Sequence, residues 1–171
     1  MISLTKKMLS IALLTATAFA SAQTKFPDGT IKLIVPFAAG GGVDNAARLI
    51  ARQMQSNMNV SIVVENKPGA NGAIATEFVA RAAPDGYTLY FPSIGHAVNV
   101  SLYKNLSYDA VKDFTAIGGV FSAPNILVVP MSSPYKTVGE LIAAGKASPG
   151  KLTFASSGSG TSVHLSAVLF E

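Results

Sequence analysis

IKLIVPFAAGGGVDNAARLIARQM, residues Ile31–Met54, decides the fold of this chain. It begins with the apolar run Ile31–Val35, which predicts a buried strand. It continues through three consecutive glycines, Gly40–Gly42, and enters a helix near Asp44. A helix start leaves backbone N–H groups without partners and carries partial positive charge, and glycines let an anion approach these groups closely. The stretch therefore predicts a strand–loop–helix unit whose loop holds a small anion, either a carboxylate or a phosphate.

The alternation of strand and helix continues to residue 91. Helical spacing of apolar residues indicates a helix over Asp44–Met58, and Ala73–Ala83 follows the same rule. The β-branched and aromatic runs Val60–Glu65 and Tyr87–Phe91 are typical of strands. This β-α-β-α-β order predicts a parallel α/β sheet, with the loops after the strands lying along one edge. Ligands bind at that edge in open α/β sheets, so we expect the site there.

The second part of the chain carries further signals of both kinds. Strands are predicted at Phe114–Val120, Asn125–Val129 and Leu152–Ala155. A capping-box pattern, with Thr137 accepting from the Glu140 N–H, begins a helix predicted over 138–147. A short helix is also expected within residues 92–108, and another over 164–170. The loop SSGSGTS, residues 156–162, precedes this last helix, with Thr161 or Ser162 as its N-cap. It repeats the strand–loop–helix arrangement, which suggests a cleft between two lobes.

The N-terminus has the three parts of an export signal. Lys6 and Lys7 form the charged start, Met8–Ala20 is the apolar stretch, and Ala20-Ser21-Ala22 fits the cleavage pattern. We therefore predict a signal peptide over residues 1–22 and a periplasmic location. The alternative, an uncleaved membrane anchor, is disfavoured because the apolar run is shorter than the roughly 20 residues that a spanning helix needs.

Composition excludes several classes of function. The formal net charge of +4 includes both lysines of the signal, and no dense Lys/Arg patch interleaved with aromatic residues is present, so a nucleic-acid partner is not expected. The chain has no cysteine, and only His96 and His164 offer imidazole, so no metal site is predicted. No paired carboxylates are spaced for acid–base catalysis, and no cofactor is expected.

The glycine loop has two other interpretations. It is compatible with a structural turn that binds nothing. Gly40 and Gly42 also fit the first two positions of a dinucleotide-binding G-x-G-x-x-G pattern, and Glu65 lies where a ribose-binding acid is found. Asn45 occupies the third glycine position, which argues against that pattern. Asp44 also has two interpretations. It serves either as a first-turn acid of the helix or as an acceptor for a ligand hydroxyl or ammonium.

The serine-rich loop lacks the spacing of a hydrolase. Ser159 lies between Gly158 and Gly160, whereas a nucleophile elbow needs G-x-S-x-G. Nothing in the spacing of His96 or His164 places either beside a serine. We therefore expect His164 to be a hydrogen-bonded structural histidine and the protein not to be an enzyme.

Together these segments resemble a known family. VPFAAGGGVDNAARLIA, VVENKPGANGAIAT, APDGYTLYF, SLYKNLSYDAVKDF, ILVVP and KTVGELIAAGKASPGKLTFASSGSGTSVHLSAVLFE are similar, in order and spacing, to the periplasmic Bug receptors of tripartite tricarboxylate transporters. The resemblance implies a type II periplasmic binding-protein (Venus flytrap) fold with two lobes. It divides this chain into a first α/β lobe over 23–125 and a hinge crossing with the start of a second, incomplete lobe over 126–171.

The resemblance also implies a site and a function. Two loops from opposite lobes hold the carboxylate of a ligand, largely through backbone amides, and Ser93–His96 lines the cleft, with Asn66–Gly72 as a further loop beside it. The predicted ligand-binding residues are Phe37, Ala39, Gly40, Gly41, Gly42, Asp44, Ser93, Gly95, His96, Ser157, Gly158, Ser159, Gly160 and Thr161. The implied function is capture of a small carboxylate-type metabolite by a monomer and its delivery to membrane transporter subunits. The alternatives are a hydrolase or dehydrogenase that uses the same cleft, or an inactive truncated fragment. Because Glu171 lies inside an apolar helical pattern, we expect the chain to be a fragment of a longer protein.

Overall fold

Three parallel strands form the centre of the structure, a computed structural model that describes residues 26–171. The predicted signal peptide, residues 1–22, lies outside the described residues. In chain order the elements are β1 (Ile31–Val35), α2 (Gly42–Met58), β2 (Ile62–Asn66), a short 3-10 turn η2 (Ala70–Gly72), α3 (Ala73–Ala80), β3 (Thr88–Tyr90), α4 (Gly95–Leu102), α5 (Val138–Ala147) and α6 (Ser162–Phe170). Every strand and helix predicted up to residue 91 is therefore confirmed, with ends shifted by at most three residues.

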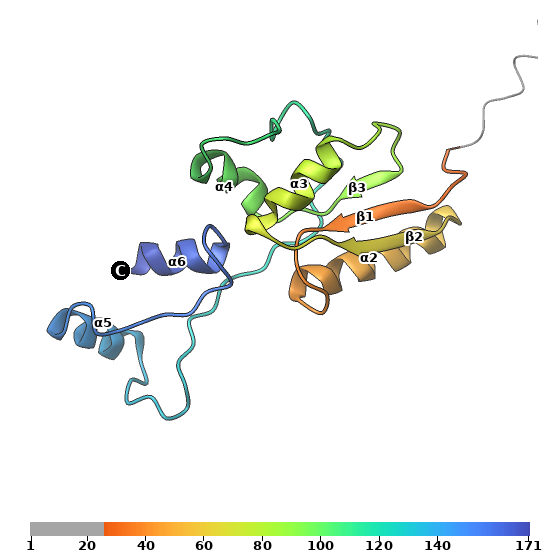
Figure 1. Cartoon of the computed structure of the whole chain (residues 1–171). Helices are drawn as coiled ribbons and strands as arrows, with labels where there is room; N and C mark the ends of the chain where they lie inside the picture. Colours follow the sequence, from red (N-terminus) through yellow and green to blue (C-terminus); the bar gives the residue numbers. More distant parts are fainter. Residues whose placement is uncertain (1–25) are drawn as a thin grey trace, which may run out of the picture.

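The sheet has the order β2-β1-β3, and both strand pairs are parallel. Ile31 pairs with Ile62 on one side of β1, and Leu33 pairs with Leu89 on the other. The carboxyl ends of the strands therefore meet at one edge, and Figure 1 shows this edge turned toward the part of the chain that carries α5 and α6. The loops predicted to form the site follow these strand ends.

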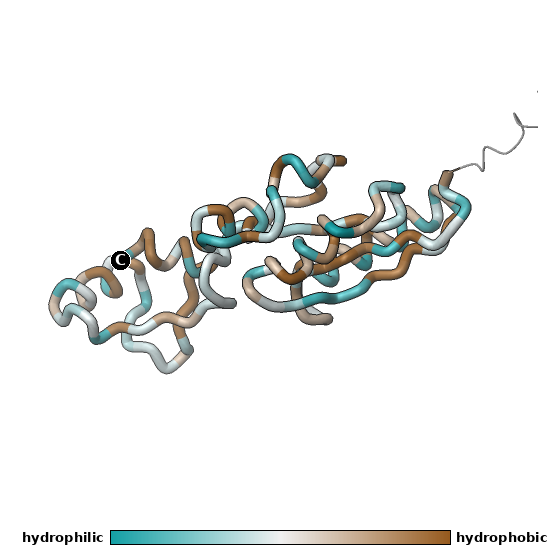
Figure 2. Tube along the Cα trace, turned by 45° about the horizontal axis from the view of Figure 1, so that its top comes forward, coloured by the Kyte–Doolittle hydropathy of each residue, from teal (hydrophilic) through white to brown (hydrophobic). Residues whose placement is uncertain are grey.

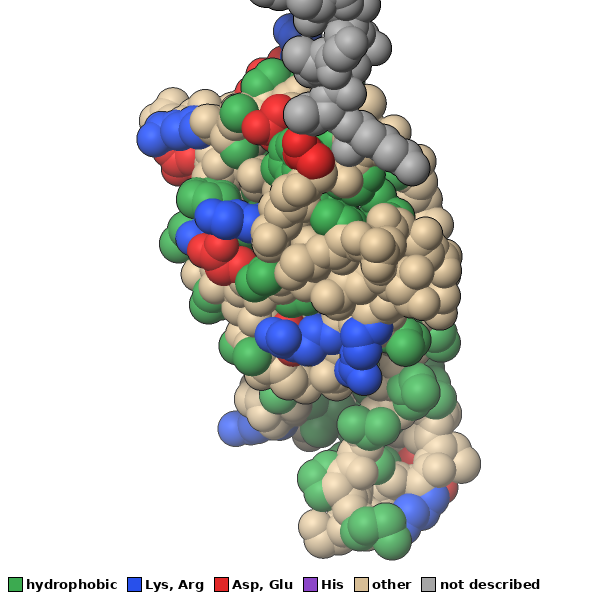
Figure 3. Space-filling model, turned by 90° about the vertical axis from the view of Figure 1, so that its right-hand side faces the viewer, with side chains coloured by type: hydrophobic (Ala, Val, Ile, Leu, Met, Phe, Trp, Pro, Cys, Tyr) green, Lys and Arg blue, Asp and Glu red, His purple; other side chains and the backbone are tan. Residues whose placement is uncertain are grey.

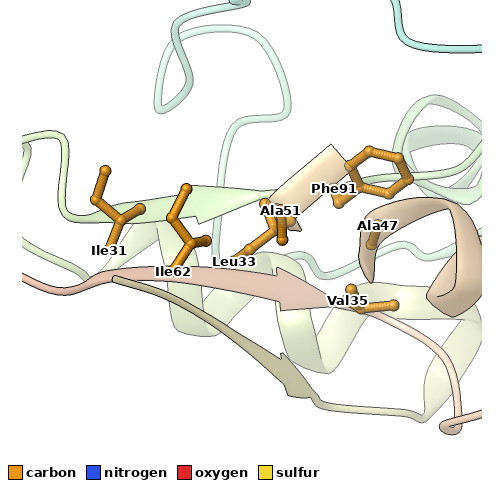
Figure 4. Packing of buried hydrophobic residues seen from close by; sticks show 7 residues of the cluster. All are labelled: Ile31, Leu33, Val35, Ala47, Ala51, Ile62 and Phe91. Atoms are coloured by element: carbon orange, nitrogen blue, oxygen red, sulfur yellow. The ribbon is translucent and has the colours of Figure 1, made fainter. Parts of the chain in front are cut away.

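The hydrophobic core lies between β1 and α2. Alternate residues of β1 point to this side and pack against two alanines of the helix, as Figure 4 shows. Because Ala47 and Ala51 are small and almost fully buried, the helix approaches the sheet closely. The core cluster consists of Ile31, Leu33, Val35, Ala47, Ala51, Ile62 and Phe91.

Helix α3 covers the sheet through polar and small side chains. Ala75 and Thr76 are fully buried, whereas Ile74 and Phe78, which the spacing places on a common apolar face, are 52% and 38% exposed. The Thr76 hydroxyl donates to the Gly72 carbonyl (2.9 Å) and lies 2.9 Å from the Tyr90 hydroxyl. Burial raises the pKa of Tyr90 to about 12. The apolar face of this helix therefore faces outward from the described core.

The strands predicted at 114–120, 125–129 and 152–155 are wrong. These segments have no regular secondary structure, and among residues 26–171 no strand pairs with them. Their large apolar side chains are exposed, among them Ile117, Ile126 and Val128 at 84%, 78% and 78%. A β-branched run becomes a stable strand only when neighbouring strands pair with its backbone. Figure 2 shows apolar residues continuing through this part of the chain, where neither α5 nor α6 has a buried residue.

Charged side chains do not gather by sign. On the face in Figure 3, Lys and Arg side chains are scattered, and several lie beside Asp or Glu. The ion pairs Lys67–Glu65 (2.8 Å) and Lys112–Asp109 (3.1 Å) are examples of such neighbours.

No helix within residues 26–171 has the length and apolar character required to span a bilayer.

Helix α5, like β1, has the bounds that the sequence predicted. Thr137 accepts from the Glu140 N–H (3.2 Å), and the Glu140 carboxylate accepts from the Thr137 N–H (3.2 Å), so the capping box is confirmed.

Thr137→Ala removes one acceptor and is expected to destabilise the helix start by about 1 kcal/mol. Amide exchange of the first turn of α5 measures this loss. Thr115→Ala, at an exposed position without regular structure, should leave that exchange unchanged. Equal exchange in both variants would contradict the prediction.

Candidate functional site

The loop after β1 presents free backbone amides at the start of a helix. Helix α2 begins at Gly42, and its N-cap, Gly41, provides no side-chain cap for the amides of the first turn. Gly40 has a φ of +87°, a conformation that glycine adopts at no steric cost, and open space surrounds the Cβ positions of both Gly40 and Gly42. Ala39 is exposed on the same loop. Apart from the Gly40 N–H, which donates to Asp44, the amides of this glycine loop are therefore accessible to an anion.

A buried carboxylate holds this loop from behind. Asp44 is 1% exposed and accepts from three donors: the Gly40 N–H (2.8 Å), Arg48 Nε (2.9 Å) and Asn66 Nδ2 (2.8 Å). Arg48 also donates to the Asn66 side-chain oxygen (2.9 Å), and Asn66 donates to the Phe37 carbonyl (2.9 Å). The network thus ties both ends of the loop to the end of β2. This geometry supports the structural role of Asp44, as a first-turn acid of the helix, over a role as an acceptor for a ligand hydroxyl or ammonium.

The charges of this network are balanced. Hydrogen bonding from Arg48, then from Gly40 and Asn66, holds the pKa of Asp44 far below its usual range, and the same contact raises the pKa of Arg48. Because the carboxylate is paired with the guanidinium and turned inward, its repulsion of an anion at the outer amides is reduced.

The second predicted loop is largely closed on itself. Thr161 is the N-cap of α6, where its hydroxyl donates to the Gly158 carbonyl (2.7 Å) and accepts from the His164 N–H (3.3 Å). The Gly160 N–H donates to His164 Nδ1 (3.4 Å), and the Gly158 N–H donates to Ser156 (3.4 Å). His164 is therefore a hydrogen-bonded structural histidine, as expected. Ser157 and Ser159 remain exposed.

The loop after β3 separates its predicted residues. Ser93 accepts from the Gly95 N–H (3.3 Å), and Gly95 is buried. His96 instead turns into an aromatic cluster, with its ring centroid 4.9 Å from that of Phe114 and 5.7 Å from that of Tyr90. Its Nε2 lies 2.9 Å from the Ala110 carbonyl oxygen. The His96 side chain thus packs against Tyr90, Phe114 and the backbone of Ala110.

The structure brings together residues that the sequence analysis did not include among the ligand-binding residues, although it placed Asn66 and Asn71 in a loop beside the cleft. Asn66 links the glycine loop to β2, and Asn71 lies against both Gly95 and Gly160. Asn99, fully buried on α4, exchanges hydrogen bonds with Asn71. The signals available were the resemblance of the loop Asn66–Gly72 to a cleft-side loop and the positions of the two residues, since Asn66 follows the predicted strand Val60–Glu65 and Asn71 lies in the turn-forming sequence after it.

The described residues do not support a dinucleotide-binding site, a serine hydrolase site or a metal site. Glu65, the candidate ribose-binding acid, is paired with Lys67 at 2.8 Å. Among residues 26–171 no serine hydroxyl is hydrogen-bonded to a histidine, and no group of three or more His, Cys, Asp or Glu side chains is placed to hold a metal ion.

Two surface hollows of the described chain lie away from the predicted site. One lies on the exposed face of α3, beside Ile74 and Phe78, and the other lies between α4 and residues 106–111. Neither is lined by a predicted ligand-binding residue.

Comparison with known proteins gives a consistent result. Residues 46–171 match the family model described as "Tripartite tricarboxylate transporter family receptor". The chain is 37% identical over 161 residues to a UPF0065 protein in the tcbD-tcbE intergenic region of Pseudomonas sp. (strain P51), covering 94% of this chain and 48% of that protein. Among solved structures it is similar to an R. palustris protein "with adipate" (37% identity, TM-score 0.81, 85% of this chain and 49% of that one). It is also similar to the periplasmic binding protein BugD (35%, TM-score 0.69, 84% and 48%).

These matches confirm the expected α/β periplasmic binding-protein fold, of which the chain is a part. The chain spans about half the length of the curated relatives that it matches.

Proposed function

Because the chain belongs to the family of tripartite tricarboxylate transporter receptors, we propose that it captures a small carboxylate at the carboxyl edge of its sheet. The family consists of periplasmic solute-binding receptors, and the proposal extends this role to the present chain: export by the predicted signal peptide, capture without covalent change, and delivery to a membrane transporter. The division into a first lobe over 23–125 and the start of a second over 126–171 is part of the proposal. It is supported by the absence of buried residues in α5 and α6.

One observation carries the proposal. The amides at the start of α2 lie without a side-chain cap beside an open glycine loop, and the neighbouring carboxylate is neutralised by Arg48. Backbone N–H groups at a helix N-terminus bind carboxylates through charge-assisted hydrogen bonds and the helix dipole. A second loop that closes over the ligand stabilises the closed form only by the contacts it adds in that form.

The ligand class follows from the same chemistry. In residues 37–42 the chain offers neutral amide donors and no charged side chain, so the loop selects for an anion without selecting its length. A relative of known structure was solved with adipate, a dicarboxylate, which makes adipate a suitable first probe.

Gly42→Pro tests the proposal on the intact chain. Gly42 is the first residue of α2, where proline is favoured, and the preceding Gly41 has the extended conformation that proline requires (φ −75°, ψ 168°). The substitution removes one amide proton and keeps the helix. If that proton is donated to the ligand carboxylate, we expect adipate affinity, measured by titration calorimetry, to fall about 10- to 100-fold.

Val138→Pro is the matched control. Val138 is also the first residue of a helix, α5, after an N-cap in extended conformation (φ −133°, ψ 156°), and it lies outside the proposed site. It should leave adipate affinity unchanged. An equal effect of the two prolines, or the absence of binding by the unsubstituted chain to adipate and to shorter dicarboxylates, would contradict the proposal.

A further inference from the structure

The structure assigns Asn71 the part of a positioning residue, which holds the loop Ser157–Thr161 against the first lobe. The observation behind this inference is that the Asn71 side chain fills the space where Gly160 would carry a Cβ atom. This role of Asn71 goes beyond the proposed function. Only the expected effect of Asn71 on ligand binding rests on that function.

Asn71 is itself held in a fixed orientation. Its backbone is left-handed (φ 50°, ψ 36°), which asparagine tolerates better than most residues. Its Nδ2 donates to Asn99 Oδ1 (3.1 Å), and Asn99 Nδ2 donates back to the Asn71 carbonyl (3.1 Å). Because Asn99 is fully buried on α4, the pair fixes both the loop after β2 and the side chain that projects from it.

The backbones of two glycines approach Asn71 closely. A Cβ atom on Gly95 would lie 2.5 Å from the Asn71 carbonyl oxygen and 2.8 Å from Oδ1. On Gly160 it would lie 2.7 Å from Asn71 Nδ2 and 2.3 Å from Leu102 Cδ1. Only a residue without Cβ allows either backbone to approach so closely. Asn71 therefore joins three segments: the loop after β2, α4, and the loop before α6.

This contact has few substitutes. The elements α5 and α6 contain no buried residue, so the part of the chain beyond residue 135 is not fixed by a core of its own. Gly160 and Thr161 are the buried residues of that part, and Gly160 is the one that touches Asn71. The placement of the second loop relative to the glycine loop thus depends on the contact of Gly160 with Asn71 and Leu102, together with the hydrogen bonds that join Asn125 to Ser162 and Ser166 of α6.

One feature distinguishes Asn71 from ordinary packing. Among residues 26–171, its Oδ1 is buried without a hydrogen-bond partner. A buried acceptor without a donor is costly and is uncommon in native structures. A movement that brings a donor to this oxygen is therefore favoured, which suits a contact between two parts that approach each other.

Hydrogen exchange of the whole chain, without ligand, tests the inference. Asn71→Gly keeps the left-handed backbone available and deletes the side chain, and we expect amides of residues 157–164 to exchange about five- to tenfold faster. Asn59→Gly is the control, because Asn59 is also left-handed (φ 52°) but exposed at the end of α2. If the two variants exchange alike in residues 157–164, the inference is wrong.

The second arm starts from the other side of the contact. Gly160→Ala adds a methyl group against Asn71, whereas Gly150→Ala adds it at nearly the same φ (+74° against +77°) into open space. We expect Gly160→Ala alone to accelerate exchange around its loop, and its effect to shrink when Asn71→Gly is also present. Equal effects of both alanines, or full additivity in the double variant, would overturn the inference.

A third measurement separates this inference from the proposed function. Adipate affinity should fall in Asn71→Gly and not in Asn59→Gly. If adipate binds no variant while the exchange results hold, the proposed function fails and the role of Asn71 in placing the loop stands.

Discussion

Ile34→Ala is expected to lower the free energy of unfolding by about 2–5 kcal/mol, the largest loss of any substitution considered. Ile34 is fully buried in the central strand, which has a neighbour on each side. Removing its side chain loses transfer free energy and leaves a cavity that β1, held by two ladders, cannot collapse to fill. Urea denaturation followed by far-UV circular dichroism measures the loss.

The same chemical change at an exposed site provides the control. Ile117 is 84% exposed, so Ile117→Ala should shift stability by no more than about 0.5 kcal/mol. Comparable losses at both positions would mean that the sheet of β1, β2 and β3 is not the stable unit of this chain.

Asp44→Asn is expected to have the second largest effect, lowering the thermal midpoint on the order of 5–10 °C. The substitution keeps the shape of the side chain but removes its charge. Arg48 then loses its charged partner. The new amide nitrogen of the side chain also faces N–H donors at a position where a carboxylate oxygen accepted hydrogen bonds. The glycine loop, tied down through this network, should also become more mobile. Asp85→Asn, at an exposed position, is the control.

The pH dependence of this effect has a definite sign. The folded pKa of Asp44 is depressed below the value of about 3.9 found in unfolded chains, chiefly by Arg48. Its stabilisation is therefore complete above that value and is lost as pH falls toward the folded pKa. The difference in thermal midpoint between the unsubstituted chain and Asp44→Asn should be largest near neutral pH and shrink below about pH 4. A difference that does not vary with pH would show that the carboxylate charge is not what stabilises the loop.

The part of the chain up to residue 91 was predictable because its signals are local. Each strand and helix up to residue 91 carries its own periodicity, and the alternation alone fixes parallel pairing. The capping box of Thr137 and Glu140 lies within four residues and could be predicted for the same reason.

The rest of the fold and of the candidate site depends on contacts between residues that are far apart in the sequence. Asn66 reaches Asp44 only because the crossover places the end of β2 beside the start of α2, and no local pattern reveals that pairing. The wrong strands at 114–120 and 125–129 show the opposite failure. Their composition is that of strands, but pairing is a property of the neighbours, which periodicity does not report. His96 was predicted at the site from a resemblance, and its ring packs in an aromatic cluster whose members are only partly close in sequence.

The exposed, unpaired run between α4 and α5 affects the solubility of this polypeptide. No charged residue lies between Asp113 and Lys136, and the valines and isoleucines of this run are open to solvent together with Phe121. Extended, uncharged, apolar stretches are the sequences that nucleate precipitation, and flanking charges are the usual safeguard against it. As long as nothing covers this run, we expect the chain to precipitate more readily as its concentration rises.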